Sequence, residues 1–292
     1  MRRLRVAIVG FGRLGRACAA AVEEAPDLAL ALAGVVRRQL APLPAPFAAV
    51  RVAQHIRDLE SVEAALLCVS ANDSAAVASE LLQGGLPVVE CAQLGEHARS
   101  EYYSLLDNVA RRHRVRAVVG AGWDPGALPL LQRLFEVLIP RGHTQVGKHP
   151  GLTLHHSAAL EDIPGVTEAL SGEWPDAQGK PKRYVYVQLA EGADAQRVRT
   201  AIRSDPLFAE DATEVLPMAD LTALEAPEGM VLERRAAPRA GEHQSLTLDA
   251  RFEAAVFAAR VMTDAARMLP FLSPGAHPYA LGLRQMPDTG RR

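Results

Sequence analysis

Three glycines with fixed spacing, Gly10, Gly12 and Gly15, directly follow an apolar run over residues 4–9 and precede an alanine-rich helical stretch. Glycine permits a tight turn, lets a ligand approach the backbone closely and lets a helix lie against a strand. The following helix offers free N–H groups and a positive dipole end to phosphate oxygens. This context favours binding of a dinucleotide pyrophosphate over a glycine turn that binds no ligand.

Two arginines, Arg37 and Arg38, follow the second predicted strand, residues 28–36. Chains that bind NAD usually carry Asp or Glu about 20 residues after the glycines, where the carboxylate binds the ribose 2′-hydroxyl. A guanidinium instead pairs with a phosphate through two hydrogen bonds and stacks on adenine. The arginines therefore favour the 2′-phosphate of NADP, with a solvated basic loop end as the alternative.

Two acidic residues, Glu90 and Asp124, follow predicted strands at the edge where a parallel sheet binds its ligands. Their carboxylates are candidates for contact with a substrate at that edge. Each residue also has a purely structural interpretation. Glu90 could be a solvated loop acid, and Asp124, which precedes Pro125, could be the N-cap of the next helix.

The other residues that could do chemistry form weaker patterns. His149, His155 and His156 are close in sequence, but adjacent histidines on a strand point to opposite faces and no H-E-x-x-H pattern accompanies them. We therefore expect no metal site, and one histidine could instead bind substrate or shuttle a proton. The three cysteines lack the spacing of a zinc site or a disulfide framework. No G-x-S-x-G motif supports a hydrolase.

The elements that must position these residues alternate between strand and helix over the first 120 residues. This alternation predicts an α/β fold, a Rossmann-type doubly wound parallel sheet with helices on both faces. The predicted strands are residues 4–9, 28–36, 50–52, 64–69, 86–89 and 115–119, and the predicted helices are residues 13–24, 74–83 and 96–113.

The pattern changes after residue 120. A helix is predicted from Pro125 to about Ile139, and the following segments mix strands and helices, which predicts a second, α+β domain. The predicted strands there are residues 182–189, 230–234 and 245–252, and the predicted helices are residues 194–203 and 254–269.

Composition narrows the classes of partner. The 292 residues carry a net charge of −2, with acidic and basic residues interspersed, so neither nucleic acid nor an anionic membrane is indicated. No segment has the roughly 20 apolar residues needed to cross a bilayer, and the apolar run at residues 4–9 is too short for a signal peptide. We expect a cytoplasmic protein with a small-molecule substrate.

Several motifs together resemble one family. They are the glycine turn and the strand before it (residues 5–12), G-V-V-R-R (34–38), L-L-C-V (66–69), A-G-W-D-P-G (121–126), I-P-G-V (163–166), A-L-S (169–171) and K-R (182–183). With these motifs the chain resembles the meso-diaminopimelate dehydrogenases, which oxidise the D-configured centre of their amino acid substrate with NADP. The A-G-W-D-P-G block is fairly specific, whereas the dinucleotide motifs are shared with many reductases.

The resemblance implies two domains, a homodimer and a set of site residues. Residues 1–120 with 254–292 would bind NADP, with a returning C-terminal helix, and residues 121–253 would bind substrate and dimerise. Asp124, Glu90 and Trp123 would be catalytic, with Asp124 touching the reacting amine. Arg183, Thr153, His155 and Glu228 would bind substrate, and Arg183 would hold a carboxylate. The cofactor residues would be Gly10, Gly12, Arg13, Leu14, Gly15, Arg37, Arg38, Cys68, Val69 and Ser70.

The chain departs from the family where the distal end of the substrate would bind. The family usually has Asp at the position of Glu90, two methionines within the stretch that matches residues 149–157, and His at the position of Glu228. The expected reaction is therefore reversible oxidative deamination of meso-diaminopimelate or a related D- or diamino acid. A sugar or hydroxy-acid oxidoreductase and a non-catalytic NADP sensor remain the alternatives.

Overall fold

A computed structural model describes residues 3–24, 30–149, 151–152, 154–175, 178–209, 212–219, 221, 228–236 and 244–280. The chain divides into two compact units, Met1–Leu131 with Ala255–Arg292, and Gln132–Ala254. The boundary between Leu131 and Gln132 lies within the helix Ala127–Leu138, whereas the sequence patterns placed the domain boundary after Gly120. In the described part of the chain, no helix combines the length and apolarity that a membrane span requires.

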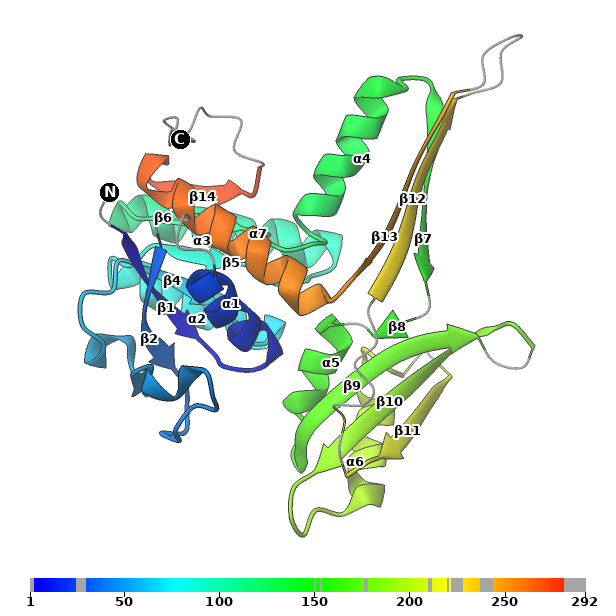
Figure 1. Ribbon diagram of the computed structural model, residues 1–292, viewed down its shortest axis with the longest axis horizontal. Coiled ribbons are helices and arrows are strands. Elements are labelled where there is room, and N and C mark those ends of the chain that lie inside the picture. Colours follow the sequence, from blue (N-terminus) through cyan, green and yellow to red (C-terminus); the bar gives the residue numbers. More distant parts are fainter. Residues whose placement is uncertain are drawn as a thin grey trace. The chain divides into compact units, whose positions relative to one another are not determined.

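Seven strands form the sheet of the first unit, in the order β14-β6-β5-β4-β1-β2-β3 (Figure 1). Every pair of neighbours is parallel, which confirms the predicted doubly wound α/β class. The strands are β1 (Leu4–Val9), β2 (Leu30–Val36), β3 (Val52–Ala53), β4 (Ala64–Leu67), β5 (Val88–Glu90), β6 (Arg116–Val119) and β14 (Gly275–Pro278). The sequence patterns did not indicate β14, which extends the sheet beyond β6.

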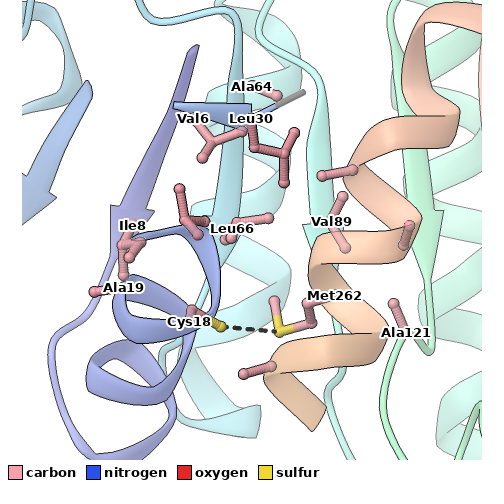
Figure 2. Packing of buried hydrophobic residues seen from close by; sticks show 14 of the residues in the cluster. Val6, Ile8, Cys18, Ala19, Leu30, Ala64, Leu66, Val89, Ala121 and Met262 are labelled. Atoms are coloured by element: carbon pink, nitrogen blue, oxygen red, sulfur yellow. Dashed lines mark hydrogen bonds between the residues drawn. The ribbon is translucent and has the colours of Figure 1, made fainter. Parts of the chain in front are cut away.

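Helices cover both faces of this sheet because alternate strand residues point to opposite sides. On one face, Val6 and Ile8 of β1 pack with Cys18 of α1 (Arg13–Glu24) and Met262 of α7 (Ala254–Met268), as Figure 2 shows. On the other face, Leu67 of β4 packs with residues of α2 (Ala71–Gln83) and α3 (Glu96–His113). These two buried clusters hold the carboxyl ends of the strands at one edge.

The second unit contains two sheets and helices, and the α+β interpretation is confirmed. One sheet has the order β11-β10-β9-β8, and the other is antiparallel with the order β13-β12-β7. The strands are β7 (Gly142–His149), β8 (Gly151–Leu152), β9 (Val166–Pro175), β10 (Pro181–Leu189), β11 (Thr213–Pro217), β12 (Glu228–Ala236) and β13 (Ser245–Phe252). The helices are α5 (Leu154–Glu161) and α6 (Ala195–Ser204), and α4 (Ala127–Leu138) leads into the unit.

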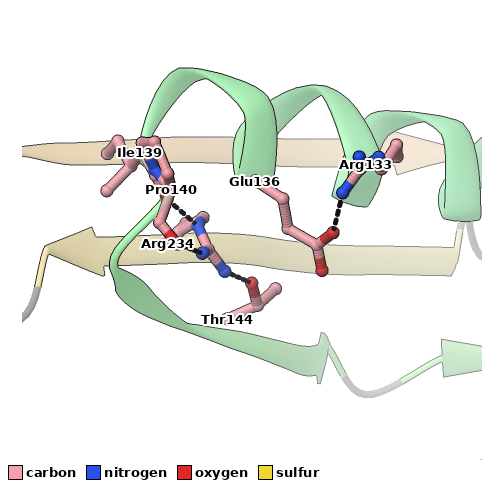
Figure 3. Close-up of polar contacts among 6 residues, drawn as sticks. All are labelled: Arg133, Glu136, Ile139, Pro140, Thr144 and Arg234. Atoms are coloured by element: carbon pink, nitrogen blue, oxygen red, sulfur yellow. Dashed lines mark hydrogen bonds and ion pairs between the residues drawn. The ribbon is translucent and has the colours of Figure 1, made fainter.

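One buried guanidinium ties the end of α4 to the three-stranded sheet (Figure 3). Arg234 of β12 donates to the carbonyls of Ile139 and Pro140 at 2.7 and 3.2 Å, and to the Thr144 hydroxyl at 2.6 Å. Ile139 and Pro140 directly follow α4, and a cation close to the C-terminal end of a helix interacts favourably with the helix dipole. Arg234 therefore fixes the C-terminal end of α4 against β7 and β12.

Candidate active site

The glycine turn between β1 and α1 leaves no room for a side chain at two of its positions. Gly10 has a φ of 92°, which residues with a Cβ rarely adopt. A Cβ at Gly10 would overlap the Cys68 carbonyl oxygen, and a Cβ at Gly15 would overlap the Gly10 carbonyl. The Gly10 N–H donates to the Val36 carbonyl at 2.9 Å. The turn therefore joins the carboxyl ends of β1, β2 and β4.

The neighbouring candidates for the cofactor lie on the elements that leave this edge. Arg13 and Leu14 begin α1 and are half-buried. Cys68 and Val69 follow β4, and the Ser70 hydroxyl caps α2 by accepting a hydrogen bond from the Asp73 N–H at 3.4 Å. The predicted start of this helix at residue 74 was wrong because Ser70 is its N-cap.

Arg37 and Arg38 follow β2 at the same edge. The Arg37 N–H donates to the Ala53 carbonyl at 3.0 Å, and the Arg38 guanidinium pairs with the Asp73 carboxylate at 2.9 Å. The Arg38 side chain is 88% exposed, and a guanidinium has five N–H donors, so it can bind a further anion. Sequence reasoning missed Asp73, which enters the site because α2 begins at Ala71.

Asp124 lies in a closed turn between β6 and α4. The Gly122 N–H donates to the Pro125 carbonyl at 3.1 Å, and the Ala127 N–H donates to the Gly122 carbonyl at 3.0 Å. Gly126 has a φ of 135°, and a Cβ there would overlap the Gly122 carbonyl. Asp124 itself is exposed. The N-cap interpretation of Asp124 was wrong, because α4 begins only at Ala127.

Trp123 is held beside Asp124 by two contacts. Its indole packs on the Phe257 ring of α7, with ring centroids 5.6 Å apart and an interplanar angle of 58°. Its carbonyl accepts the Leu128 N–H at 2.8 Å, inside the first turn of α4. The turn therefore presents one exposed carboxylate next to a half-buried aromatic ring. Sequence reasoning missed Phe257 because it comes from a distant helix.

Glu90 is entirely buried at the end of β5, so the interpretation as a solvated loop acid was wrong. One carboxylate oxygen accepts the Ala92 N–H at 2.6 Å, and the other accepts the Gly120 N–H at 2.7 Å. The Glu90 backbone carbonyl also accepts the Ala121 N–H at 2.8 Å. Glu90 thus binds the segment that leads from β6 into the Asp124 turn.

The surroundings of Glu90 determine its protonation. Burial raises the pKa of the Glu90 carboxyl to about 7, against the opposing effect of the two N–H donors and the Tyr102 hydroxyl. Burial, together with the nearby Glu90, likewise raises the pKa values of Tyr102 and Tyr103. Both phenols therefore stay neutral while Glu90 titrates near neutral pH.

The three cysteines, unrelated in spacing, lie close to one another beneath this edge. The Cys68 and Cys18 sulfurs are 3.7 Å apart, and the Cys18 sulfur lies 3.9 Å from that of Met262. The contact with Cys18 and burial raise the pKa of the Cys68 thiol, and burial raises the pKa of Cys91. Raised pKa values keep the Cys68 and Cys91 thiols protonated and poorly nucleophilic.

Arg183 lies in the second unit and is buried on β10. Its guanidinium contacts the Ser171 hydroxyl and the Glu173 carboxylate, each at 3.4 Å. The Ser171 N–H in turn donates to the Ser157 hydroxyl of α5 at 2.8 Å. Sequence reasoning missed Glu173, because the β9–β10 pairing that opposes it to Arg183 is not visible in local patterns.

The other candidate substrate residues are less fully described. Thr153 and the side chains of His155 and Glu228 lie outside the described residues. The His155 backbone belongs to α5, not to a strand, and Glu228 is the first residue of β12. The described residues include no group of three or more His, Cys, Asp or Glu placed to hold a metal ion.

Known proteins resemble this chain over nearly its whole length, although no family model matches it. The meso-diaminopimelate D-dehydrogenase of Bacteroides fragilis is 31% identical over 279 residues, which cover 95% of this chain and 92% of that protein. This chain belongs to the meso-diaminopimelate D-dehydrogenase family. The meso-diaminopimelate D-dehydrogenase of Ureibacillus thermosphaericus is 29% identical over 236 residues, which cover 72% of this chain and 70% of that protein. The predicted resemblance is therefore confirmed, and membership makes the chain a dehydrogenase.

Solved structures of dehydrogenases share the fold. An engineered D-amino acid dehydrogenase bound to NADP+ superposes with a TM-score of 0.76 at 23% identity, covering 94% of this chain and 93% of that chain. The C. glutamicum DAP dehydrogenase in complex with DAP gives a TM-score of 0.73 at 24% identity, covering 95% and 93%. At these identities the likeness establishes the fold, including both the parallel sheet and the second unit.

The buried acid predicts how the stability of this dehydrogenase depends on pH. The folded pKa of Glu90 is about 7 and that of an unfolded Glu is about 4.5, so the folded state holds the proton more tightly. The stability contributed by this proton is present below pH 4.5 and is lost as pH rises through 7. Gln does not titrate, so the free energy of unfolding of Glu90→Gln should fall by roughly 3 kcal/mol less than that of wild type as the pH rises through this range.

Urea unfolding of both proteins between pH 5 and pH 8 measures this effect. All other titratable groups are common to the two proteins, so the quantity to compare is the difference between the two pH slopes. Equal slopes in wild type and Glu90→Gln would show that the Glu90 pKa is not raised.

Proposed function

We propose that the chain catalyses NADP-dependent oxidative deamination of an amino acid, reversible as reductive amination. One observation carries the proposal most strongly: the similarity that shows family membership covers 95% of the chain. In addition, the turn that bears Asp124 lies at the sheet edge that carries the glycine turn. The expected cytoplasmic location remains part of the proposal.

The residues of the first unit fit NADP. A side chain at Gly10 or Gly15 would collide with the backbone, so the turn at the N-terminus of α1 stays open for a pyrophosphate. Arg38 presents an exposed guanidinium at the end of β2, where the 2′-phosphate of NADP needs a cation. When bound, NADP supplies a nicotinamide ring that accepts a hydride.

The chain's own residues would bind and orient the substrate rather than react with it covalently. The exposed Asp124 carboxylate would accept hydrogen bonds from the amine at the reacting carbon, and Trp123, fixed by Phe257, would shape the adjacent surface. Arg183 would pair with a substrate carboxylate. Holding the reacting carbon in one orientation removes much of the entropic barrier of the reaction.

The substrate is meso-diaminopimelate or a related D- or diamino acid. The reacting-centre residues Trp123 and Asp124 match the family, whereas Glu228 and the stretch that includes Thr153 and His155 depart from it. We assign these departures to the end of the substrate away from the reacting carbon, so the amino acid accepted can differ from that of the relatives.

Asp124→Asn should lower kcat/KM for the preferred amino acid by about 100-fold, equivalent to ~3 kcal/mol, because the amide cannot balance the charge of an ammonium group. The measurement follows NADPH absorbance across a panel of D-amino and diamino acids. Asp58→Asn, an exposed acid of the same unit, is the matched control.

The same assay separates the alternative functions. Turnover with hydroxy acids or sugars and none with amino acids would contradict the proposal. Tight NADPH binding without turnover on any substrate would favour a sensor.

Arg38→Ala should raise the KM for NADPH about 10-fold, because one charge-assisted contact to the 2′-phosphate is lost. The KM for NADH should change by less than about twofold, since NADH lacks this phosphate. Steady-state kinetics with both cofactors measures the effect, with the exposed Arg112→Ala as control. An equal loss with both cofactors would show that Arg38 does not read the phosphate.

We also propose a homodimer formed through the second unit. Leu134, Val137 and Leu138 recur at helical spacing on α4 and are half or more exposed, and Val146 on β7 is 42% exposed. Monomeric proteins rarely expose several large apolar side chains together. A second copy of the chain is the partner that would cover them.

Leu138→Glu should convert the dimer to a monomer, because it places a charge in an apolar interface. Sedimentation velocity measures the change, and Leu105→Glu, an exposed leucine of α3 in the first unit, should leave the dimer intact. A wild-type protein that sediments as a monomer at micromolar concentration would contradict this assembly.

A further inference from the structure

We propose that Glu90 is a positioning residue, which sets the place of the Asp124 turn through the Gly120 N–H and does not itself contact the substrate. The role of Asp124 on which this inference depends rests on the proposed function. The control that Glu90 exerts over the turn rests on contacts within the first unit alone.

The Glu90 carboxylate faces the protein interior. Its side chain has no exposed surface, and each of its two oxygens already accepts a backbone N–H at 2.6 or 2.7 Å. Each oxygen could accept a second hydrogen bond, but the carboxylate has no exposed surface, so a substrate amine could reach it only if the surrounding backbone opened. An acid whose oxygens bind backbone on both sides is placed to hold that backbone.

Glu90 accepts hydrogen bonds from Gly120 and Ala121, the two residues that lead from β6 into the Asp124 turn. Its side chain accepts the Gly120 N–H, and its backbone carbonyl accepts the Ala121 N–H at 2.8 Å. Gly120 has a φ of 64°, and a Cβ there would overlap the Tyr103 hydroxyl, so the segment has little freedom at this point. Cys91, the residue after Glu90, lies against Gly122.

Movement at Gly120 would be passed on to Asp124 because the turn is closed on itself. The Gly122 N–H binds the Pro125 carbonyl, and both carbonyls that a Cβ at Gly126 would meet, those of Gly120 and Gly122, belong to the same turn. Such a turn shifts as a unit. Its base is held by Glu90 and one side by the packing of Trp123 on Phe257.

The length of the Glu90 side chain suits this function. One Glu90 oxygen reaches the N–H two residues later, and the other reaches the N–H of Gly120, which follows β6. Asp is shorter by one methylene and would draw its carboxylate back from at least one of these two N–H groups. Gln has the right length but replaces one acceptor oxygen with an NH2 donor, which repels the N–H that it faces. Glu90→Asp and Glu90→Gln therefore test the contact in two independent ways.

Neutral groups surround the carboxyl group. Tyr102 and Tyr103 of α3 and the Cys91 thiol lie near it, and the raised pKa values of all three keep them uncharged near neutral pH. The protonation of Glu90 itself is therefore the main charge change at the base of the turn. Protonation weakens the carboxyl group as an acceptor for the Gly120 N–H.

Acrylamide quenching of Trp123 reports on the turn without any substrate. The chain has two tryptophans, so Trp174→Phe leaves Trp123 as the only one, and excitation at the red edge of the absorption band avoids the five tyrosines. In this background we expect Glu90→Asp and Glu90→Gln to raise the quenching constant at least about twofold, since Trp123 loses its fixed packing. NADPH binding should stay within about twofold of wild type, which shows that the parallel sheet is folded.

The kinetic part of the experiment uses the full-length enzyme. Both Glu90 variants should lower kcat about 10-fold or more while the KM for the amino acid changes less, because orientation is lost rather than a binding contact. Glu80→Asp and Glu80→Gln, at an exposed position of α2, are matched controls and should behave as wild type.

Two results would overturn the inference. One is unchanged Trp123 quenching in both variants; the other is a raised KM with unchanged kcat, which would indicate direct contact of Glu90 with substrate. If wild type turns over no amino acid, the proposed function fails, while the quenching comparison still decides whether Glu90 holds the turn.

A pH titration of Trp123 quenching in the otherwise wild-type background covers the case in which the variants do not fold. Quenching should increase as pH falls, with a midpoint near 7, the pKa of Glu90. A flat profile between pH 5 and pH 9 would contradict the proposed control of the turn.

Discussion

The candidate site depends on two backbone turns that pack so closely against neighbouring atoms that a Cβ would not fit at their key glycines. The Gly10 turn packs against the Cys68 carbonyl, and the Asp124 turn is bound to the buried Glu90 through the Gly120 N–H. Both turns lie at the carboxyl edge of one parallel sheet, where strand ends leave space for ligands. Burying an acid has a cost, and the short N–H contacts offset part of it.

The sequence predicted the features that local patterns determine. The apolar run, the glycine spacing and the alanine-rich helix correctly placed β1, the turn and α1, because strand, turn and helix follow one another without interruption. Arg37 and Arg38 could be placed at the end of β2 for the same reason. The two-residue motif Trp123-Asp124 was found through resemblance, since its local pattern equally suited a helix cap.

The remaining features depend on contacts between distant segments. β14 joins the sheet beside β6, Cys18 meets Cys68, and Glu173 faces Arg183 across paired strands. Glu90 is the clearest case, because an acid at a strand end is usually solvated. Its burial depends on two N–H donors, and one of them, that of Gly120, is 30 residues away. The periodicity of apolar residues along the chain carries no information about which distant segments meet. The charge of Glu90, taken alone, suggests a solvated position, whereas the residue is buried.

The central claim is hydride transfer from the carbon that bears the amine to the nicotinamide of NADP. Deuterium at that carbon of the preferred D- or diamino acid provides the most direct test, with proton NMR of the recovered cofactor as the measurement. The expected result is one deuterium at C4 of the reduced nicotinamide and a slower turnover than with the protiated substrate. Reduced cofactor without deuterium, or no reduction with any amino acid while NADP binds, would contradict it.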